Sequence, residues 1–446
     1  MTPISDRDAQ GRPLVVITGM GVLTSLGRGQ QENWAALTAG RSGIRRVTRF
    51  PTEGMRTTIA GTVDFMPGSG SAAPALSEQF AECVIEEALE EAGLARPAGQ
   101  GGDFPGPLFL ALPPVELEWP QRLAMMAAAN NAAEAEPGTP DLPGAYRTML
   151  HAAETGRFAD EYRRFLFGSV AENLAERFGT RGSPVATSTA CASGGTAIQL
   201  GLEAIRRGET EIALCVGTDA SINPESIIRF SLLSALSTRN DPPSAASRPF
   251  SKDREGFVMA EGAGALVIES LAHARARGAT ILGVLSGTGE MTDSFHRTRS
   301  SPDGRPIIGS LRNALADAGL APEAIGYINA HGTGTPENDK MEWLGVSTVF
   351  GEQASTLPMS SNKSMIGHTL TAAGAVEAVF TLLSLRHQLL PPTINYDIPD
   401  PALPVDCVPN IARPARFAHA MSNSFGFGGQ NVCLVLSAAP GDIAGA

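Results

Sequence analysis

The chain has 446 residues, a formal net charge of −12 and 43% hydrophobic residues. This length exceeds a single typical core and predicts two domains or two fused half-domains. The acidic balance argues against nucleic acid or an anionic membrane surface as the main partner. The polar start, the lack of a long apolar run and five scattered cysteines without a CxxC pair predict a cytoplasmic protein without stable membrane insertion.

The first predicted element is a buried strand that enters a glycine loop within residues 13–27. Gly19 and Gly21 could begin a dinucleotide-binding fingerprint, but Thr24 stands where the third glycine is required. No acidic residue follows at the right distance after a clear helix. A nucleotide site is therefore not expected here.

An internal repeat organises the rest of the chain. Residues 86–94 and 312–320 both end helices and lead to predicted strands at 107–112 and 325–330. Two small-residue turns then open apolar helices, and a predicted pair of strands around a glycine loop follows each, at 256–269 and 420–437. This alternation predicts two duplicated α/β halves with a mostly parallel sheet, at residues 1–275 and 276–446.

The segment 113–168 has a different texture from its surroundings. Ala-rich helical stretches alternate with a break rich in Pro, Gly, Asp and Thr. We interpret this segment as a helical cap inserted over the first half. A solvated excursion without a function would show the same texture.

Cys191 stands among Ala, Ser and Gly at a predicted turn from a strand into a helix. The positive end of a helix dipole favours a thiolate over a thiol, so this position suits a reactive cysteine. A small buried cysteine that only packs against glycines would produce the same pattern. The remaining motifs have to decide between the two interpretations.

Further reactive groups lie at the carboxyl ends of predicted strands, where an α/β sheet collects its site residues. His331 follows the strand at 325–330, and Lys363 and His368 precede a helix. Phe425 and Phe427 lie in a glycine loop. Each motif alone has an ordinary structural explanation, but together they predict one site.

These residues suit carbon–carbon bond formation on a thioester. A cysteine thiolate attacks a thioester carbonyl and forms an acyl-enzyme. Two neutral histidines can donate hydrogen bonds to a developing enolate, and Lys363 beside them disfavours their protonation. Decarboxylation of a malonyl unit would supply the carbanion without a metal or a nucleotide. A zinc site from Cys191, His331 and His368 is not favoured, because no two of them have typical ligand spacing.

Four blocks of the chain, "TACASG", "NAHGTGTPENDKMEW", "SNKSMIGHTLTAAGAVEA" and "SNSFGFGGQN", resemble signatures of elongating, type II-like β-ketoacyl-acyl-carrier-protein synthases. This resemblance implies a thiolase-like α-β-α-β-α fold and a homodimer. It also implies decarboxylative Claisen condensation of an acyl-thioester with malonyl-acyl-carrier protein, which gives a 3-oxoacyl-acyl-carrier protein in fatty acid biosynthesis. The phosphopantetheine of the carrier holds the substrates, and no cofactor is required.

The resemblance also implies a role for each residue. Cys191 would be the acylated nucleophile, and His331 and His368 would assist decarboxylation, with Lys363 paired to Glu342. The backbone N–H groups of Cys191 and Phe427 would form the oxyanion hole, and Phe427 would gate acyl entry. The residues that match substrate-binding positions of the family are Thr333, Thr335, Phe425, Gly428, Gly429, Asp293, His296 and Thr298.

The chain departs from the family pattern at residues 108–122, where a glycine-rich stretch is usual, so chain-length preference cannot be transferred. With the insertion, this motivates the hypothesis of a dedicated carrier or unusually long acyl chains. Two alternatives stay open, a non-condensing partner subunit similar to a chain-length factor and a Cys-His thioester hydrolase. An acidic carrier needs a basic docking patch, for which the candidates are Arg206, Arg207, Arg163 and Arg164.

Overall fold

The computed structural model describes residues 5–68, 72–95, 102–132, 147, 150–151 and 154–439. The main sheet contains β1 (Val15–Thr24), β5 (Leu108–Ala111), β6 (Val185–Thr187), β7 (Ile212–Asp219) and β8 (Gly262–Ser270) from the first half. The second half contributes β9 (Gly283–Thr292), β10 (Ile325–Asn329), β11 (Met359–Ser360), β14 (His419–Phe425) and β15 (Gln430–Ser437). Short ladders are formed by β2 (Gly27–Arg28), β3 (Arg45–Arg46), β4 (Ile59–Ala60), β12 (Leu389–Leu390) and β13 (Arg413–Pro414).

The strand order confirms the predicted duplication. Along the sheet the order is β6-β5-β7-β8-β1-β9-β15-β14-β10-β11. Counted outward from the β1–β9 junction, the strands of the first half (β1, β8, β7, β5, β6) correspond one by one to those of the second (β9, β15, β14, β10, β11). The parallel pairs are β5 with β6 and β7, and β10 with β11 and β14, whereas β7–β8, β8–β1, β14–β15, β15–β9 and β1–β9 are antiparallel. The sheet is therefore mixed, and the expectation of a mostly parallel sheet is wrong.

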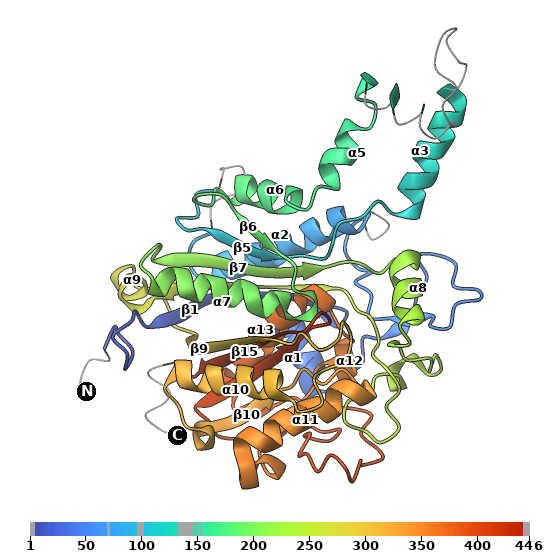
Figure 1. The fold of residues 1–446 in the computed structure, drawn as a ribbon. Coiled ribbons are helices and arrows are strands. Elements are labelled where there is room, and N and C mark those ends of the chain that lie inside the picture. The colour runs from blue at the N-terminus through green and yellow to red at the C-terminus, as the bar shows by residue number, and fades with distance from the viewer. Residues whose placement is uncertain are drawn as a thin grey trace.

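The strands of the two halves form two layers. Helices lie between these layers and on both outer sides, which makes five layers in all (Figure 1). Helices α2 (Ala73–Glu91) and α6 (Ser169–Phe178) cover the first half, and α10 (Arg305–Ala318) and α11 (Pro336–Phe350) cover the second. Helices α7 (Ser193–Arg206) and α13 (Ala373–His387) lie between the halves, because each contacts strands of both. This is the predicted α-β-α-β-α arrangement. Shorter helices are α1 (Gly29–Thr38), α8 (Pro224–Leu232), α9 (Leu271–Ala276) and α12 (Lys363–Ile366).

Glycines in the first turns of α7 and α13 let these two helices touch through backbone atoms. A Cβ at Gly194 would lie 2.5 Å from the backbone nitrogen of Ala375, and a Cβ at Gly374 would lie 2.4 Å from that of Gly195. Real Cβ atoms do not approach a backbone this closely. This close packing of the two helices explains why the predicted turns are rich in small residues.

The glycines near the N-terminus also serve helix packing. Gly19 and Gly21 lie within β1, where added Cβ atoms would lie 2.0 Å from the Ala88 carbonyl oxygen and 1.9 Å from that of Val84. Helix α2 therefore lies directly on β1, and these glycines form no phosphate-binding loop.

A pair of strands around a glycine loop was expected in each half, and only the second half has one. Residues 420–437 form the β14–β15 hairpin as expected, whereas in 256–269 the regular strand is β8 alone. β8 pairs with β7 and β1, and the connection between β7 and β8 carries α8. The predicted boundary between residues 275 and 276 lies between β8 and β9, and its exact position stays a prediction.

Part of the segment 113–168 is described, and it forms α3 (Trp119–Ala132) and α5 (Ala159–Arg164). These helices project from the body as an arm (Figure 1), and so the expectation that they lie as a cap over the first half is wrong for them. None of the helices in the described ranges is long and apolar enough to cross a bilayer.

We predict that Gly374→Ala destabilises the protein by about 1–3 kcal/mol, because the added methyl group overlaps the backbone of α7. Helix propensity alone would change stability by about 1 kcal/mol in the opposite direction. Urea unfolding measures the difference. Gly168→Ala is the control, since its Cβ would meet only a Glu172 carboxylate oxygen at 3.8 Å. Equal stability of the two variants would contradict the packing argument.

Candidate active site

Three reactive side chains from distant parts of the chain meet in one place. Cys191 lies in the 3-10 turn Ala190–Ala192 that opens α7, His331 follows β10, and His368 precedes the turn Leu370–Ala372 that opens α13. The Cys191 sulfur and one ring nitrogen of each histidine lie within 4.8 Å of one another. The two imidazole rings are 5.2 Å apart and nearly perpendicular, at 82°.

The two turns that open α7 and α13 correspond in the duplicated fold. Each begins with a non-glycine residue in the left-handed region, Ala190 at φ 50° and Leu370 at φ 47°. Such residues are strained and persist where the surrounding structure holds them. Cys191 and Thr371 therefore occupy equivalent positions, and only the first half places a nucleophile there.

The Cys191 thiol is protonated in the resting site. Burial raises its pKa to about 11, although a hydrogen bond from the Phe427 backbone N–H and the charge of Lys363 act in the opposite direction. The loss of water around the sulfur outweighs these two effects, so the site favours a resting thiol rather than the expected thiolate. The Cys191 thiol therefore has to lose its proton during the attack on the substrate.

His368 is a neutral hydrogen-bond donor. Its Nδ1 accepts a hydrogen bond from the Leu370 N–H at 3.2 Å, which leaves the ring proton on Nε2. Burial, and then the charge of Lys363, hold the pKa of this imidazole well below its ordinary value. Its Nε2 is buried and has no hydrogen-bond partner within the described part of the chain. An unused donor next to a thiol is a functional feature, because an orphaned buried N–H is costly.

His331 has the same protonation state for a similar reason. The Lys363 ammonium donates to the His331 carbonyl oxygen at 2.7 Å and lies 3.5 Å from its Nδ1. An ammonium can only donate, so it favours a lone pair on Nδ1 and the proton on Nε2. Burial, and then Lys363 and His368, lower the pKa of His331 well below its ordinary value.

The carboxylate partner of Lys363 is Glu377, so the expected pair with Glu342 is wrong. Lys363 donates directly to the Glu377 carboxylate, and both side chains are buried. Glu342, on α11, instead accepts the backbone N–H groups of His331 at 2.9 Å and Gly332 at 2.7 Å. It therefore shapes the turn that carries the histidine. Burial raises the pKa of Glu377 to about 7.

Glu377 was missed from the sequence although a signal was present. It is the sole charged residue between Ala373 and Leu385, in a stretch of α13 that is buried throughout. A single acid in a fully apolar helix requires a buried partner, since an isolated buried charge is very unfavourable. Its partner could have been sought among the nearby motif residues, where Lys363 is the obvious cation.

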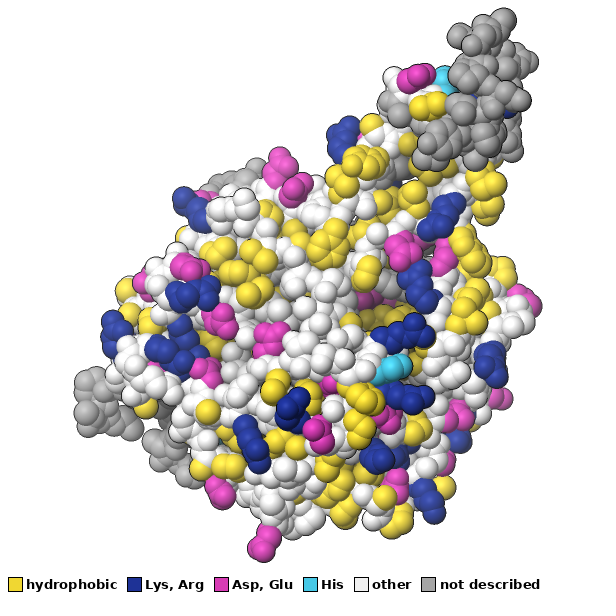
Figure 2. Space-filling model, in the orientation of Figure 1, with side chains coloured by type: hydrophobic (Ala, Val, Ile, Leu, Met, Phe, Trp, Pro, Cys, Tyr) yellow, Lys and Arg dark blue, Asp and Glu magenta, His cyan; other side chains and the backbone are white. Residues whose placement is uncertain are grey.

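An open pocket leads to the three residues. Predicted substrate-binding residues on its wall are Asp293, His296, Thr298, Thr333, Thr335, Phe425 and Gly429, together with the predicted gate Phe427. Gly428 is not on the wall, and its N–H donates to the Arg297 carbonyl oxygen at 2.8 Å. Phe230, Phe257, Arg297 and Arg299 also line the pocket and were not predicted. Figure 2 shows Lys and Arg side chains around a hollow, beside a histidine.

Asp293 holds the entrance loop in shape. Its carboxylate accepts the backbone N–H groups of Phe295 at 2.9 Å and Ser301 at 2.7 Å. Its own N–H donates to the Gly429 carbonyl oxygen at 2.7 Å. The 293–301 loop and the glycine loop are thus tied together, and a movement of one would be transmitted to the other.

The basic candidates from the sequence do not line this pocket. Arg206 pairs with Asp317 at 2.7 Å, Arg207 with Glu209 at 2.7 Å, and Arg163 with Asp160 at 3.1 Å. Arg163 and Arg164 belong to α5 of the projecting arm. Among the described residues the arginines on the pocket wall are Arg297 and Arg299.

The same three side chains could in principle present ligands to a metal ion, since a sulfur and two imidazole nitrogens lie within 4.8 Å. Lys363 and the Leu370 N–H, however, direct the ring protons to the Nε2 atoms. A metal ion would have to displace these protons. The donor set as it stands suits a substrate carbonyl, which accepts hydrogen bonds.

Comparison with known proteins agrees with this geometry. The N-terminal domain model of β-ketoacyl synthases matches residues 13–103 and 145–274, and the C-terminal domain model matches residues 282–397. The chain belongs to the β-ketoacyl synthase family. It is therefore a condensing acyltransferase. Residues 104–144 match neither model, and the start of the arm lies in this gap.

Similar proteins include 3-oxoacyl-[acyl-carrier-protein] synthase 2 of Coxiella burnetii, 37% identical over 95% of this chain and 98% of that protein. The tetracenomycin polyketide synthase ketoacyl synthase alpha subunit of Streptomyces glaucescens is 34% identical over 95% of this chain and 96% of its own length. The fold is similar to a type II polyketide ketosynthase in complex with its acyl-carrier protein and bound to the hexaketide. That comparison has a TM-score of 0.80 and 33% identity, with 96% of this chain and 100% of the other covered.

We predict that alkylation of this β-ketoacyl synthase by iodoacetamide at Cys191 accelerates about tenfold per pH unit between about pH 7 and pH 10. The thiolate is the reacting form, and a pKa of about 11 leaves its fraction rising throughout this range. An ordinary cysteine, with a pKa of about 8.5, would approach a plateau. Mass spectrometry of the modified peptide measures the rate. A plateau near neutral pH would contradict the buried thiol.

Proposed function

We propose that this synthase condenses an acyl group held on Cys191 with malonyl-acyl-carrier protein, with loss of CO₂, to give a 3-oxoacyl-acyl-carrier protein. The observation that carries the proposal is a thiol within 4.8 Å of two imidazoles that are neutral donors. Neither a metal nor a nucleotide is needed for these steps.

In the first half-reaction the Cys191 sulfur attacks the carbonyl carbon of an acyl-thioester. The backbone N–H groups of Cys191 and Phe427 hold the negative oxygen of the tetrahedral intermediate. The bond from the acyl carbon to the sulfur of the carrier arm then breaks, and the arm leaves as a thiol with the proton that Cys191 gives up. Because the resting thiol has a raised pKa, this proton transfer accompanies the attack.

In the second half-reaction the malonyl thioester carbonyl accepts the Nε2–H groups of His331 and His368. Breaking of the bond to the carboxylate releases CO₂ and leaves an enolate, whose charge these two donors stabilise. The enolate carbon attacks the acyl carbonyl, and the bond from the acyl carbon to the Cys191 sulfur breaks. Cys191 leaves as a thiolate, which takes a proton from solvent and becomes the resting thiol again. Protonated histidines would be less suitable, since they would attract the malonyl carboxylate and oppose its loss.

The two other functions from the sequence fit less well. A non-condensing partner subunit has no need of a nucleophile, yet Cys191 faces both histidines here. The chain is 34% identical to a chain in a structure of the ishigamide ketosynthase/chain length factor, so fold alone does not separate these functions. A Cys-His hydrolase needs one histidine, and it would leave the unpartnered Nε2 of His368 without a role.

We propose acyl carrier protein as the partner and fatty acid biosynthesis as the pathway. Thr333 and Thr335, with hydroxyl groups 3.0 Å apart on the pocket wall, suit the polar phosphopantetheine arm. Arg297 and Arg299 supply positive charge for an acidic carrier. The free cysteines support a cytoplasmic location.

We further propose a homodimer, because β6 ends the sheet path and no strand within the described ranges pairs with its outer edge. Val185 on this strand is 39% exposed. A sheet edge of this kind readily pairs with another chain, and a second copy can do so with two-fold symmetry.

We predict that His368→Ala lowers kcat for condensation by about 10²–10³, because it removes a donor to the enolate. Formation of the acyl-enzyme at Cys191 should persist and be visible by mass spectrometry. Cys191→Ala should abolish both acylation and condensation. Condensation by either variant at the wild-type rate would refute the mechanism, and release of free acid by the wild type would favour the hydrolase.

We predict that Arg297→Glu with Arg299→Glu raises KM for malonyl-acyl-carrier protein about tenfold and leaves kcat nearly unchanged. The effect should shrink at high salt, since it depends on exposed charges. The matched control is Arg163→Glu with Arg164→Glu on the arm. An equal effect of the arm variant would move the docking surface away from the pocket mouth.

A further inference from the structure

The Asp219 carboxyl group joins the two halves of the fold beside the reactive residues. Asp219 ends β7 and is fully buried. Its Oδ2 lies 2.7 Å from the Thr371 hydroxyl oxygen and 3.1 Å from the Thr371 backbone nitrogen. Thr371 belongs to the turn between His368 and α13, at the position that Cys191 has in the first half. A strand of the first half is therefore bonded to the turn beside His368.

The end of β7 lies against the N-terminal ends of both α7 and α13. A Cβ at Gly217 would lie 3.4 Å from the Cα of Gly194 and 3.2 Å from that of Ala372. Asp219 faces the same side of the sheet as Gly217, because residues two apart in a strand do so. Next to burial, an ionised Asp219 also raises the pKa of Cys191. The charge of this carboxyl group therefore matters to the nucleophile.

The hydroxyl group of Thr371 has one hydrogen for two close acceptors. Its oxygen lies 2.9 Å from the Thr218 carbonyl oxygen and 2.7 Å from Oδ2 of Asp219. A threonine hydroxyl can donate one hydrogen bond and accept others. A carbonyl oxygen has no hydrogen to give. The hydrogen of the second bond therefore has to come from the carboxyl group of Asp219.

A protonated Asp219 satisfies every one of its contacts. Its Oδ2–H donates to the Thr371 hydroxyl oxygen, and the same Oδ2 keeps a lone pair for the Thr371 N–H. Its Oδ1 accepts the Ser221 N–H at 3.0 Å. In an ionised carboxylate, by contrast, Oδ2 would face the hydroxyl oxygen without a hydrogen between them, and the two lone pairs would repel each other.

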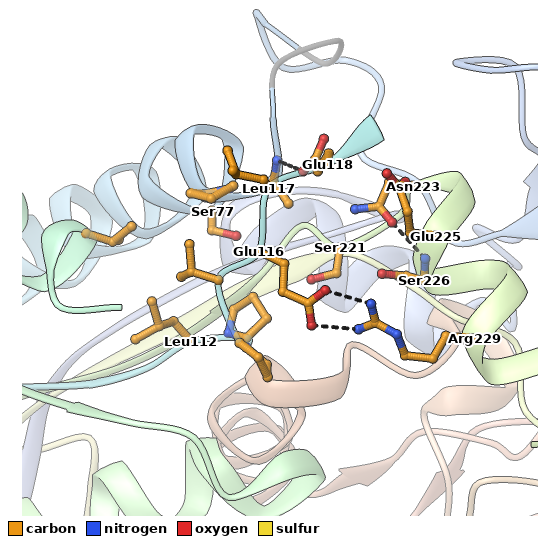
Figure 3. Close-up of a pocket in the computed structure, with 16 residues that line it drawn as sticks. Ser77, Leu112, Glu116, Leu117, Glu118, Ser221, Asn223, Glu225, Ser226 and Arg229 are labelled. Atoms are coloured by element: carbon orange, nitrogen blue, oxygen red, sulfur yellow. Dashed lines mark hydrogen bonds and ion pairs between the residues drawn. The ribbon is translucent and has the colours of Figure 1, made fainter. Parts of the chain in front are cut away.

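The surroundings of Asp219 also favour the neutral form. Burial raises its pKa, and the groups that act most strongly against this effect are the hydroxyl and N–H groups of Thr371 and Ser221, which carry no charge. A second cavity, with Ser77 and Ser221 on its wall, begins two residues further along the chain (Figure 3). Asp219 itself lines neither this cavity nor the reaction pocket, so neither one brings water to its carboxyl group.

We propose that Asp219 carries a proton in the resting enzyme and positions, through its hydrogen bond to Thr371, the turn beside His368. The proposal deepens the proposed condensing function and rests on it for the part that concerns His368. The proton leaves no negative charge beside the Cys191 thiol, which has to ionise during the attack. It also gives Thr371 a second hydrogen bond, so that both Thr218 and Asp219 hold the turn.

The first test detects the proton directly. Asp219→Asn replaces the acid with a neutral amide that can still donate to Thr371 and accept the Ser221 N–H. Infrared difference spectra of the wild type against this variant are recorded at neutral pH in H₂O and in D₂O. They should show a carbonyl band of a protonated carboxylic acid that shifts in D₂O. Absence of this band from the wild type would overturn the proposal.

A second measurement uses Cys191 as a probe of the charge. Iodoacetamide should alkylate Asp219→Asn at neutral pH within about threefold of the wild-type rate, since the substitution removes no charge. Removal of an ionised carboxylate would instead lower the pKa of Cys191 and accelerate alkylation about tenfold for each pKa unit. A rate outside the expected range would contradict a protonated Asp219.

Thr371→Val tests the positioning role, because it keeps the shape of the side chain and removes the hydroxyl group. The kcat for condensation should fall about five- to tenfold, which corresponds to the loss of one hydrogen bond. Acylation of Cys191 should keep its rate, since His368 serves only the second half-reaction. Thr371→Ser, which keeps the hydroxyl group, should retain the wild-type kcat.

The matched control is Thr57→Val, which removes a buried hydroxyl group that donates to the Ser237 carbonyl oxygen at 2.7 Å. Both half-reactions should keep their rates in this variant. Equal losses in Thr371→Val and Thr57→Val, or a loss of acylation as large as that of condensation, would refute the positioning role. Failure of the wild type to condense would instead refute the proposed function, and the infrared band would still report the proton.

Discussion

The contact between the N-termini of α7 and α13 sets the geometry of the site. Gly194 and Gly374 let the two helices meet backbone to backbone, at distances that no side chain allows. Since Cys191 lies on the turn before one helix and His368 just before the turn of the other, this contact brings the sulfur and the imidazole together. His331 enters from the neighbouring strand β10. The fold thus builds one site from two copies of the same turn.

Burial then decides the chemistry of each group. Loss of water keeps Cys191 as a thiol and both histidines neutral, and the Lys363 charge reinforces the state of the histidines. A buried ammonium is unfavourable without a partner, and Glu377 supplies one. Because buried pairs contribute little to stability on balance, the main effect of the Lys363–Glu377 pair is on the imidazoles.

Reaction and selectivity occupy different parts of the chain. The reactive groups lie on the turns and strand ends of the duplicated core. Part of the wall around them comes from connections, namely residues 293–300 after β9 and the β7–β8 connection with α8. Connections tolerate insertion and substitution more readily than core elements do.

The sequence by itself indicated the duplication, because short motifs with small residues and reactive groups recur at corresponding places. The layer order, the condensing reaction and the roles of the residues that gather in the pocket followed from its resemblance to the β-ketoacyl synthases. The sequence also indicated Lys363 as the cation beside the histidines. The tertiary structure decided that Glu377 rather than Glu342 pairs with Lys363, that the thiol is protonated, that the sheet is mixed and that α3 and α5 form an arm. Each of these depends on long-range contacts and on the exclusion of water. The pattern of residues along a chain does not specify which of two nearby acids faces a lysine, or how much solvent reaches a sulfur.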